Sequence, residues 1–248
     1  MKKSFAFLPF SALLSLMLFA HEAVAVTPGY YVVTTYDEED VKAIDFNFWN
    51  VKLPNASAVY APQIGFSYGV TSRWFTELFG EDIHTDAGGT AFSNWSWEND
   101  YMITQGQYPI DLAMHTLITR FHNTNSGVGL EYGPVMQGDI GRVQLNGNIF
   151  FEREYEAGQT NRMQMKYQWQ VKYRWKPQFA YGLEGFGELG EWRDWSPESA
   201  QSHRIGPAIF TTLHRAGDKV FKLDAAYLFG KIFGKEAKVF TLRAHYEF

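Results

Sequence analysis

Cysteine is absent from the 248-residue chain, which excludes disulfides, thiolate metal sites, thiol catalysis and lipid attachment to cysteine. An excess of basic residues is absent as well. The chain has 22 lysines and arginines against 27 aspartates and glutamates, for a formal net charge of −5. This balance lacks the electrostatic footprint of a nucleic-acid-binding protein.

Long apolar runs are scarce, and the one clear run lies at the N-terminus. Two lysines precede the apolar stretch 5–20, and a small-x-small cleavage site follows at 23–25. This pattern is typical of a secretory signal peptide, so we expect residues 1–25 to be removed. A membrane-anchor helix is the alternative, which the proline within the short run disfavours.

Beyond residue 25 no run approaches the ~20 apolar residues that a membrane-spanning helix needs. Aromatic residues nevertheless make up 17% of the chain, while the mean hydropathy is −0.27. The apolar residues are therefore dispersed. Either the protein is a soluble exported β-protein, or its apolar side chains alternate with polar ones along membrane-crossing strands.

The segment 162–175, RMQMKYQWQVKYRW, alternates polar and apolar residues without a break. Such alternation is the main sequence signal of a β-strand whose two faces meet different surroundings. Similar runs predict about twelve strands, with ten as the alternative. We expect them at roughly 41–50, 58–69, 73–81, 90–103, 108–121, 127–138, 141–155, 161–175, 179–192, 202–213, 219–231 and 236–248. Most exceed the ~5–6 residues of a typical globular strand and suit a tilted membrane crossing of ~9–11 residues.

Short connectors alternate along the chain with longer, more polar ones. A meander with both chain ends on one side gives this alternation. We therefore expect an all-β fold, an antiparallel up-and-down transmembrane barrel over residues 41–248, after a signal peptide (1–25) and an N-terminal extension (26–40). The stretch YYVVTTYDEED at 30–40 either lengthens the first strand, lines the lumen or lies in the periplasm.

Alternation alone does not distinguish a soluble sandwich or lipocalin-like binder from a membrane barrel, in which apolar side chains face lipid and polar ones line the interior. Aromatic residues at both ends of the predicted strands favour the barrel, because tyrosine and tryptophan anchor at membrane interfaces. Near the tight turns and the C-terminus these are Trp74, Tyr101, Tyr108, Trp175, Phe179, Tyr246 and Phe248. At the opposite ends they are Trp49, Phe121, Tyr155 and Trp192.

Charges of both signs occupy the polar faces, which line the lumen in a barrel. The candidates for a solute pathway are Asp111, His115, Glu131, Arg142, Arg162, Lys166, Lys172, Arg174, Glu184, Glu188, Arg243 and His245. The expected registers place Lys166 opposite Glu188, and Arg162 near Glu154. Pairing throughout would brace a narrow pore, whereas basic and acidic ladders on opposite walls would orient passing solutes. The sequence leaves both arrangements open.

The C-terminal stretch VFTLRAHYEF has apolar residues at every second position back from Phe248. It resembles the C-terminal assembly signal of Gram-negative outer-membrane β-barrels. The resemblance implies an outer-membrane location, periplasmic chain ends, and contact with membrane lipid and the barrel-assembly machinery. The stretch YGVTSRWFTELFGE is also similar to the strand–turn–strand units of small transporter barrels linked to aromatic-compound degradation.

Motifs for catalysis or cofactor binding are weak. GFGELG (185–190) matches a dinucleotide fingerprint but opens no helix, so its glycines fit a bend or close approach in a strand. His115 shares a face with Asp111, and Glu131 lies on the next strand, which allows an acid–base pair or a metal site. A hydrogen-bonded lumen histidine is the preferred interpretation of His115, and likewise a plain surface or lumen role for His203. We therefore expect no metal and no cofactor.

These observations predict a non-enzymatic outer-membrane channel or transporter for small solutes. An outer-membrane hydrolase with a site at the loop-side rim, around Asp111, His115 or His203, is one alternative. A structural or adhesive barrel with a plugged lumen is another. Short loops disfavour both a large adhesive surface and an elaborate enzyme site.

Overall fold

The computed structural model describes residues 30–35, 39–85, 88–123, 126–158, 162–214 and 219–248. The strands are β1 (Lys42–Lys52), β2 (Val59–Thr71), β3 (Trp74–Thr85), β4 (Gly89–Met102), β5 (Ile110–Phe121), β6 (Val128–Ile140), β7 (Val143–Tyr155), β8 (Gln164–Lys176), β9 (Phe179–Glu191), β10 (Asp194–Trp195), β11 (Ser202–His214), β12 (Val220–Ile232) and β13 (Lys235–Glu247), with a 3₁₀ turn η2 (Glu198–Ala200). In this part of the chain, no helix is long and apolar enough to cross a membrane.

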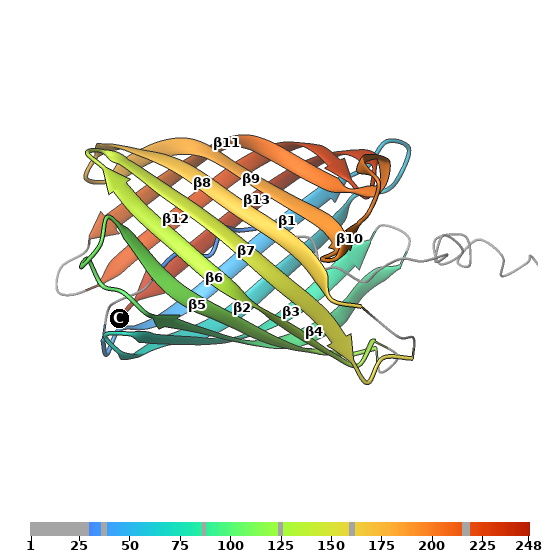
Figure 1. Cartoon of the computed structure of the whole chain (residues 1–248), viewed down its shortest axis with the longest axis horizontal. Helices are drawn as coiled ribbons and strands as arrows, with labels where there is room; N and C mark the ends of the chain where they lie inside the picture. The colour runs from blue at the N-terminus through green and yellow to red at the C-terminus, as the bar shows by residue number, and fades with distance from the viewer. Residues whose placement is uncertain (1–29, 36–38, 86–87, 124–125, 159–161, 215–218) are drawn as a thin grey trace, which may run out of the picture.

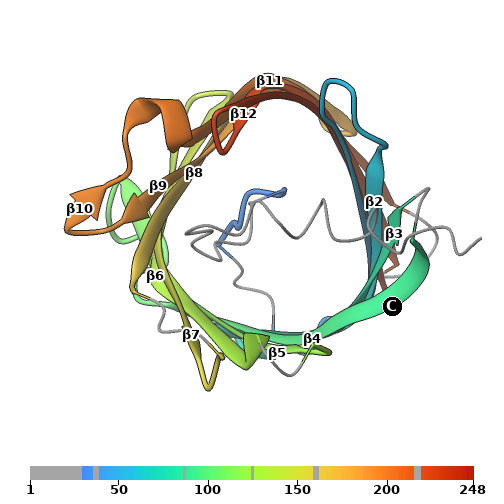
Figure 2. The same cartoon turned by 90° about the vertical axis from the view of Figure 1, so that its right-hand side faces the viewer.

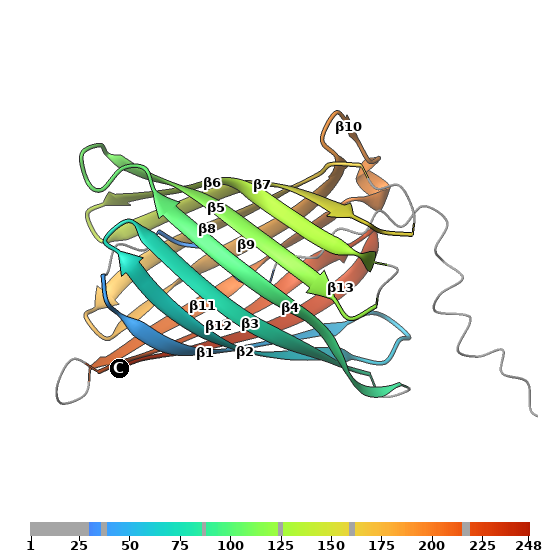
Figure 3. The same cartoon turned by 90° about the horizontal axis from the view of Figure 1, so that it is seen from below.

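All the strands except β10 form one closed antiparallel barrel of twelve strands, tilted against its axis (Figures 1 and 3). Sequential neighbours pair around the wall, and pairing between β1 and β13 closes it. The predicted fold class and strand number are confirmed, and the ten-strand alternative is wrong. The missed element, β10, is a two-residue strand that pairs only with the end of β9.

The barrel has two distinct ends. We call the end that holds Lys42 and Glu247 the terminal end, and the opposite one the loop end. Two-residue turns at the terminal end join β2 to β3, β6 to β7 and β8 to β9, and this end also carries the connector 103–109, while the loop end carries the longest connectors, 156–163 and 192–201. One tight turn lies at the loop end, where Phe233 (φ 46°) and Gly234 (φ 74°) are both left-handed, as a type I′ hairpin requires.

Burial alternates along the strands, and the outer face is apolar. Large exposed side chains on the outer face include Ile44, Phe46, Ile64, Phe66, Leu78, Trp95, Trp97, Met114, Ile118, Leu145, Val171, Leu183, Ile205, Ile209, Tyr227, Phe229 and Phe240. A soluble protein rarely exposes so continuous an apolar surface. A closed barrel also satisfies its wall's backbone hydrogen bonds without water. The fold is therefore a membrane-spanning barrel, and the soluble alternatives do not fit it.

The alternating segment in β8 follows the predicted sidedness. Gln164, Lys166, Gln168 and Gln170 are buried in the interior, and the intervening residues face outward. On the outer face, an added Cβ at Gly185 would overlap the Trp169 ring, and one at Gly187 would overlap Tyr167. These glycines of GFGELG thus permit a close approach of aromatic rings, as the strand interpretation predicts.

Candidate functional site: the barrel lumen

Residues 30–35 enter the barrel and lie inside its lumen, where they appear as the short blue segment in Figure 2. Their side chains divide between the two walls. Tyr30 and Val32 belong to an apolar cluster with residues of β1, β2, β9 and β11–β13. Tyr31 and Val33 belong to a second cluster with Met102, Ala113, Val135 and Phe150, on β4–β7. Of the three locations that the sequence allows for this stretch, residues 30–35 take the lumen.

Polar contacts fix this lumen segment in place. The Val33 amide donates to Gln168 Oε1 at 3.0 Å, and Asn148 Nδ2 donates to the Val33 carbonyl at 2.8 Å. The Tyr31 hydroxyl donates to Glu98 Oε2 at 3.4 Å.

Trp49 faces inward and stacks on Tyr30 with ring centroids 4.2 Å apart. Its indole Nε1 donates to Glu81 Oε2 at 3.1 Å. Phe121 also lines an interior cavity. The prediction that these two aromatic residues belong to a membrane-interface belt is wrong. Trp49 shares its strand face with Asp45 and Asn47, so its contacts with the lumen segment replace those with lipid.

The lumen segment separates two cavities. The larger, about 440 Å³, lies toward the terminal end and is lined by Tyr30, Thr34 and polar residues of many strands. Its charged lining residues are Lys172, Arg174, Glu184, Lys222, Asp224, Arg243, His245 and Glu247. The two signs are nearly balanced, so the cavity is polar without a strong net charge.

The smaller cavity, about 90 Å³, lies beside Tyr31 and Val33. Four carboxylates line it, at Glu81, Glu98, Glu131 and Glu152, together with His115 and Lys166. Its lining is therefore more acidic than that of the larger cavity.

Many lumen charges form buried pairs. Lys166 Nζ contacts Glu131 and lies 3.1 Å from Glu152 Oε2. Arg204 makes a bidentate contact with Glu188 at 2.7 and 2.8 Å, with both side chains almost fully buried. These pairs favour the braced lumen over opposing charge ladders, because acidic and basic groups lie side by side in the barrel interior.

Of the two predicted residue pairings across strands, one register is confirmed and the other is wrong. Lys166 is the Cα partner of Glu188, as predicted, although its ammonium reaches Glu131 and Glu152 instead. Arg162 does not pair with Glu154. Its Nη1 lies 2.8 Å from Glu191 Oε2, in an exposed position at the loop end.

The structure places most predicted lumen residues inside the barrel. His115, Glu131, Lys166, Glu184, Glu188 and His245 are buried there, and Lys172, Arg174 and Arg243 line the larger cavity. His245 Nδ1 lies 2.6 Å from Asp45 Oδ1. Three candidates depart from the prediction, because they lie at the ends of the wall. They are Arg162, Arg142 in the turn after β6, and Asp111, which accepts from Thr104 and Gly106 in the connector before β5.

The predicted interface aromatics lie at strand ends. Trp74, Tyr101, Tyr108, Trp175, Trp192 and Phe248 are exposed, and Phe179 and Tyr246 are half-buried. Trp74 pairs with Tyr101 across β3 and β4, and Trp175 contacts Phe179 across the turn between β8 and β9. Seven lie toward the terminal end, and Trp192 lies at the loop end.

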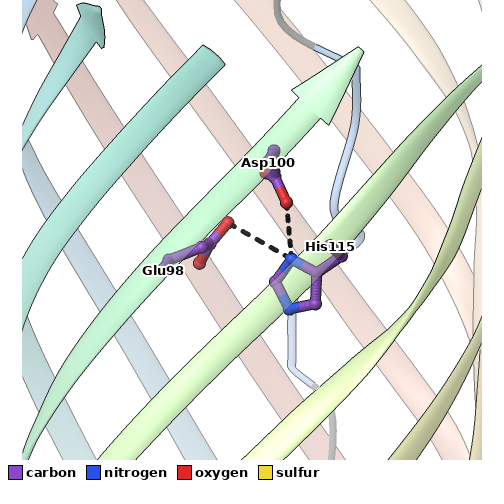
Figure 4. Close-up of side chains that lie close together, drawn as sticks. All are labelled: Glu98, Asp100 and His115. Atoms are coloured by element: carbon purple, nitrogen blue, oxygen red, sulfur yellow. Dashed lines mark hydrogen bonds and ion pairs between the residues drawn. The ribbon is translucent and has the colours of Figure 1, made fainter. Parts of the chain in front are cut away.

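Sequence reasoning missed several buried lumen residues. Asp45, Glu77, Glu98 and Asp100 are each at most 2% exposed. Figure 4 shows Glu98 and Asp100 of β4 directed toward His115 of β5. The sequence contained the signal for Glu98 and Asp100. They alternate with Trp95, Trp97 and Tyr101, which face outward, so their own side chains face inward. Of the residues named for a rim site, His115 is buried in the wall, and His203 bonds Tyr167 and Gln201.

Comparison with known proteins finds similarity in structure alone. No family model and no curated protein sequence match the chain. A solved outer-membrane channel from Pseudomonas putida F1 is similar over 90% of this chain and all of its own, with a TM-score of 0.58 and 10% identity. The NanC porin is similar over 81% of this chain and 98% of its own, with a TM-score of 0.54 and 13% identity.

These likenesses agree with the fold derived above. A closed antiparallel barrel with an apolar outer face and a polar interior is the architecture of Gram-negative outer-membrane β-barrels. The chain has this fold.

Proposed function

We propose that the protein is an outer-membrane channel for small solutes whose resting lumen is closed at residues 30–35. The polar cavity of about 440 Å³ inside the closed wall is the observation that carries this proposal. Such a volume lies within the range of small-molecule sites. Passage along the barrel requires the lumen segment to move, because its side chains contact both walls.

The polar lining sets the selectivity of this channel. Lys172 has no ion pair within 4.0 Å among the described residues, and its ammonium lies 4.5 Å from the Phe210 ring centroid. Glu184 and Asp224 line the same cavity. A small solute with both donors and acceptors therefore finds complementary groups. The solved structures called a channel and a porin agree with passage of solutes.

The terminal end lies in the periplasm in this proposal, with the loop end outside the cell. Short turns on the periplasmic side and longer loops outside are the rule for outer-membrane barrels. Signal-peptide removal before Val26 and insertion by the barrel-assembly machinery precede this state. The terminal Phe248 provides the expected assembly signal.

Solute flux into liposomes tests the proposal. Thr241 is buried and lines the larger cavity, whereas the neighbouring Phe240 is exposed on the outer face. We expect wild type to admit small sugars or amino acids, Thr241→Trp to slow their entry severalfold, and Phe240→Trp to leave it unchanged.

A second variant makes the absence of flux informative. Gln168→Ala removes the side chain that holds the Val33 amide, so it should raise flux above wild type. No flux through either wild type or Gln168→Ala would contradict solute passage. A similar slowing by both tryptophan variants would contradict the assigned cavity.

A further inference from the structure

We propose that Glu98, Asp100 and His115 bind a divalent first-row transition-metal ion of the Zn²⁺ class on the inner wall of the barrel. Asp100 is the Cα partner of His115 across β4 and β5, and Glu98 shares the inward face of β4. The three side chains therefore meet in the lumen wall, as Figure 4 shows. The site is independent of whether solutes pass.

The ligand atoms are close to metal-binding geometry. One such atom from each residue lies within 4.8 Å of the others. His115 Nδ1 lies 2.7 Å from Asp100 Oδ1 and 3.9 Å from Glu98 Oε1. Bonds of about 2.0–2.2 Å to a tetrahedral ion separate its ligand atoms by roughly 3.4 Å. Shifts well under the length of a side chain therefore convert the hydrogen-bonded cluster into a ligand set.

A supporting shell around His115 is already in place. Its other ring nitrogen, Nε2, lies 3.6 Å from Glu131 Oε1, and Glu131 contacts Lys166. Phe150 packs against the imidazole with ring centroids 4.6 Å apart. Histidines that ligate metals usually direct their second nitrogen to such a carboxylate, which fixes the ring and raises its basicity.

One oxygen of the cluster itself lacks a partner. Asp100 Oδ2 has no hydrogen-bond partner among the described residues, and the Asp100 side chain is 2% exposed. Its other oxygen, Oδ1, bonds His115. An unpartnered buried carboxylate oxygen is costly, and a dication bound by Asp100 removes that cost.

The donor set selects the class of ion. One imidazole nitrogen with carboxylate oxygens suits Zn²⁺ and its first-row neighbours, whereas Ca²⁺ and Mg²⁺ prefer oxygen alone. The cavity of about 90 Å³ is lined by Glu98 and His115 and leaves room beside them for the ion and water. Glu98 Oε2 accepts from Tyr31, so its Oε1 is the oxygen that reaches the metal.

Metal binding to the full barrel in detergent tests the site. After chelator treatment, equilibrium dialysis against zinc chloride should show one Zn²⁺ per wild-type barrel. Asp100→Asn and His115→Gln should each weaken binding at least tenfold, and Glu131→Gln by about 10–100-fold through loss of the supporting carboxylate. Glu184→Gln is the matched control, since this buried carboxylate bonds Gln170 outside the cluster.

Cobalt spectroscopy on the unaltered protein covers the case of a variant that does not fold. Co²⁺ should give a wild-type d–d absorption spectrum of a low-coordinate site, displaced by Zn²⁺ and not by Ca²⁺. No stoichiometric Zn²⁺ and no such spectrum in wild type would overturn the proposal. Unchanged Zn²⁺ affinity in folded His115→Gln would overturn it equally.

Discussion

Arginine substitution at two adjacent residues of β8 tests the sidedness of the wall. Val171 faces outward and is 37% exposed, and it pairs with Leu183 on the outer face. Gln170 faces inward and donates to Glu184 Oε1 at 2.8 Å, and both line the larger cavity. The two positions differ by one residue along the strand, so depth in the membrane is nearly matched.

The magnitude follows from the surroundings of each side chain. Arginine on the lipid face near the midplane costs about 2–4 kcal/mol, which lowers the folding equilibrium constant by roughly 30- to 1000-fold. Arginine at 170 instead places its charge beside the Glu184 carboxylate. We expect Gln170→Arg to cost less than Val171→Arg, because its charge faces the polar cavity and a carboxylate rather than lipid.

Equilibrium urea unfolding in phospholipid vesicles, followed by tryptophan fluorescence, measures both values. The prediction concerns the difference in the free energy of unfolding between the two variants, so it does not depend on the absolute stability of the barrel. Equal destabilisation by Val171→Arg and Gln170→Arg, or a larger loss for Gln170→Arg, would refute the assigned orientation of β8.

Two further predictions concern the interior and the outer face. Arg204→Met or Glu188→Leu alone should cost about 3–5 kcal/mol, because each removes the bidentate partner of a buried charge, and the double variant should cost clearly less than the sum of the two. Additive single losses in the same unfolding assay would contradict a coupled pair. Gly185→Ala should lower the free energy of unfolding by about 1–3 kcal/mol, because the added methyl displaces the Trp169 ring. Gly147 lies on the other side of Trp169 and has open space around an added Cβ, so Gly147→Ala should not destabilise the barrel. Equal costs would argue against that ring position.

The strand pattern was predictable because period-two alternation over long segments leaves few alternatives. β8 shows this best, since a slip of one residue would turn Trp169 inward and Gln168 outward. The short strand β10 carries no such pattern, because Asp194 and Trp195 pair with only two residues of β9. Sequence reasoning therefore had nothing to detect there.

The lumen was predictable in composition and less so in its contacts. The alternation of side chains along β8 places Lys166 inside. Strand pairing alone does not reveal that its ammonium reaches Glu131 rather than Glu188. For Trp49, the alternation along β1 already indicated an inward-facing side chain. The prediction instead followed the general tendency of tryptophan to lie at membrane interfaces. Tyr30–Val33 has no alternation to orient it, so its insertion into the lumen emerges only from the tertiary structure.

Conductance in planar bilayers tests the central claim, that a polar lumen is closed by residues 30–35. Wild type should stay in low-conductance states with occasional openings, since the segment is held by Gln168, Asn148 and contacts on both walls. A variant lacking residues 30–35 should show larger and steadier single-channel currents. Equal conductance in the two proteins, or none in either, would contradict the account.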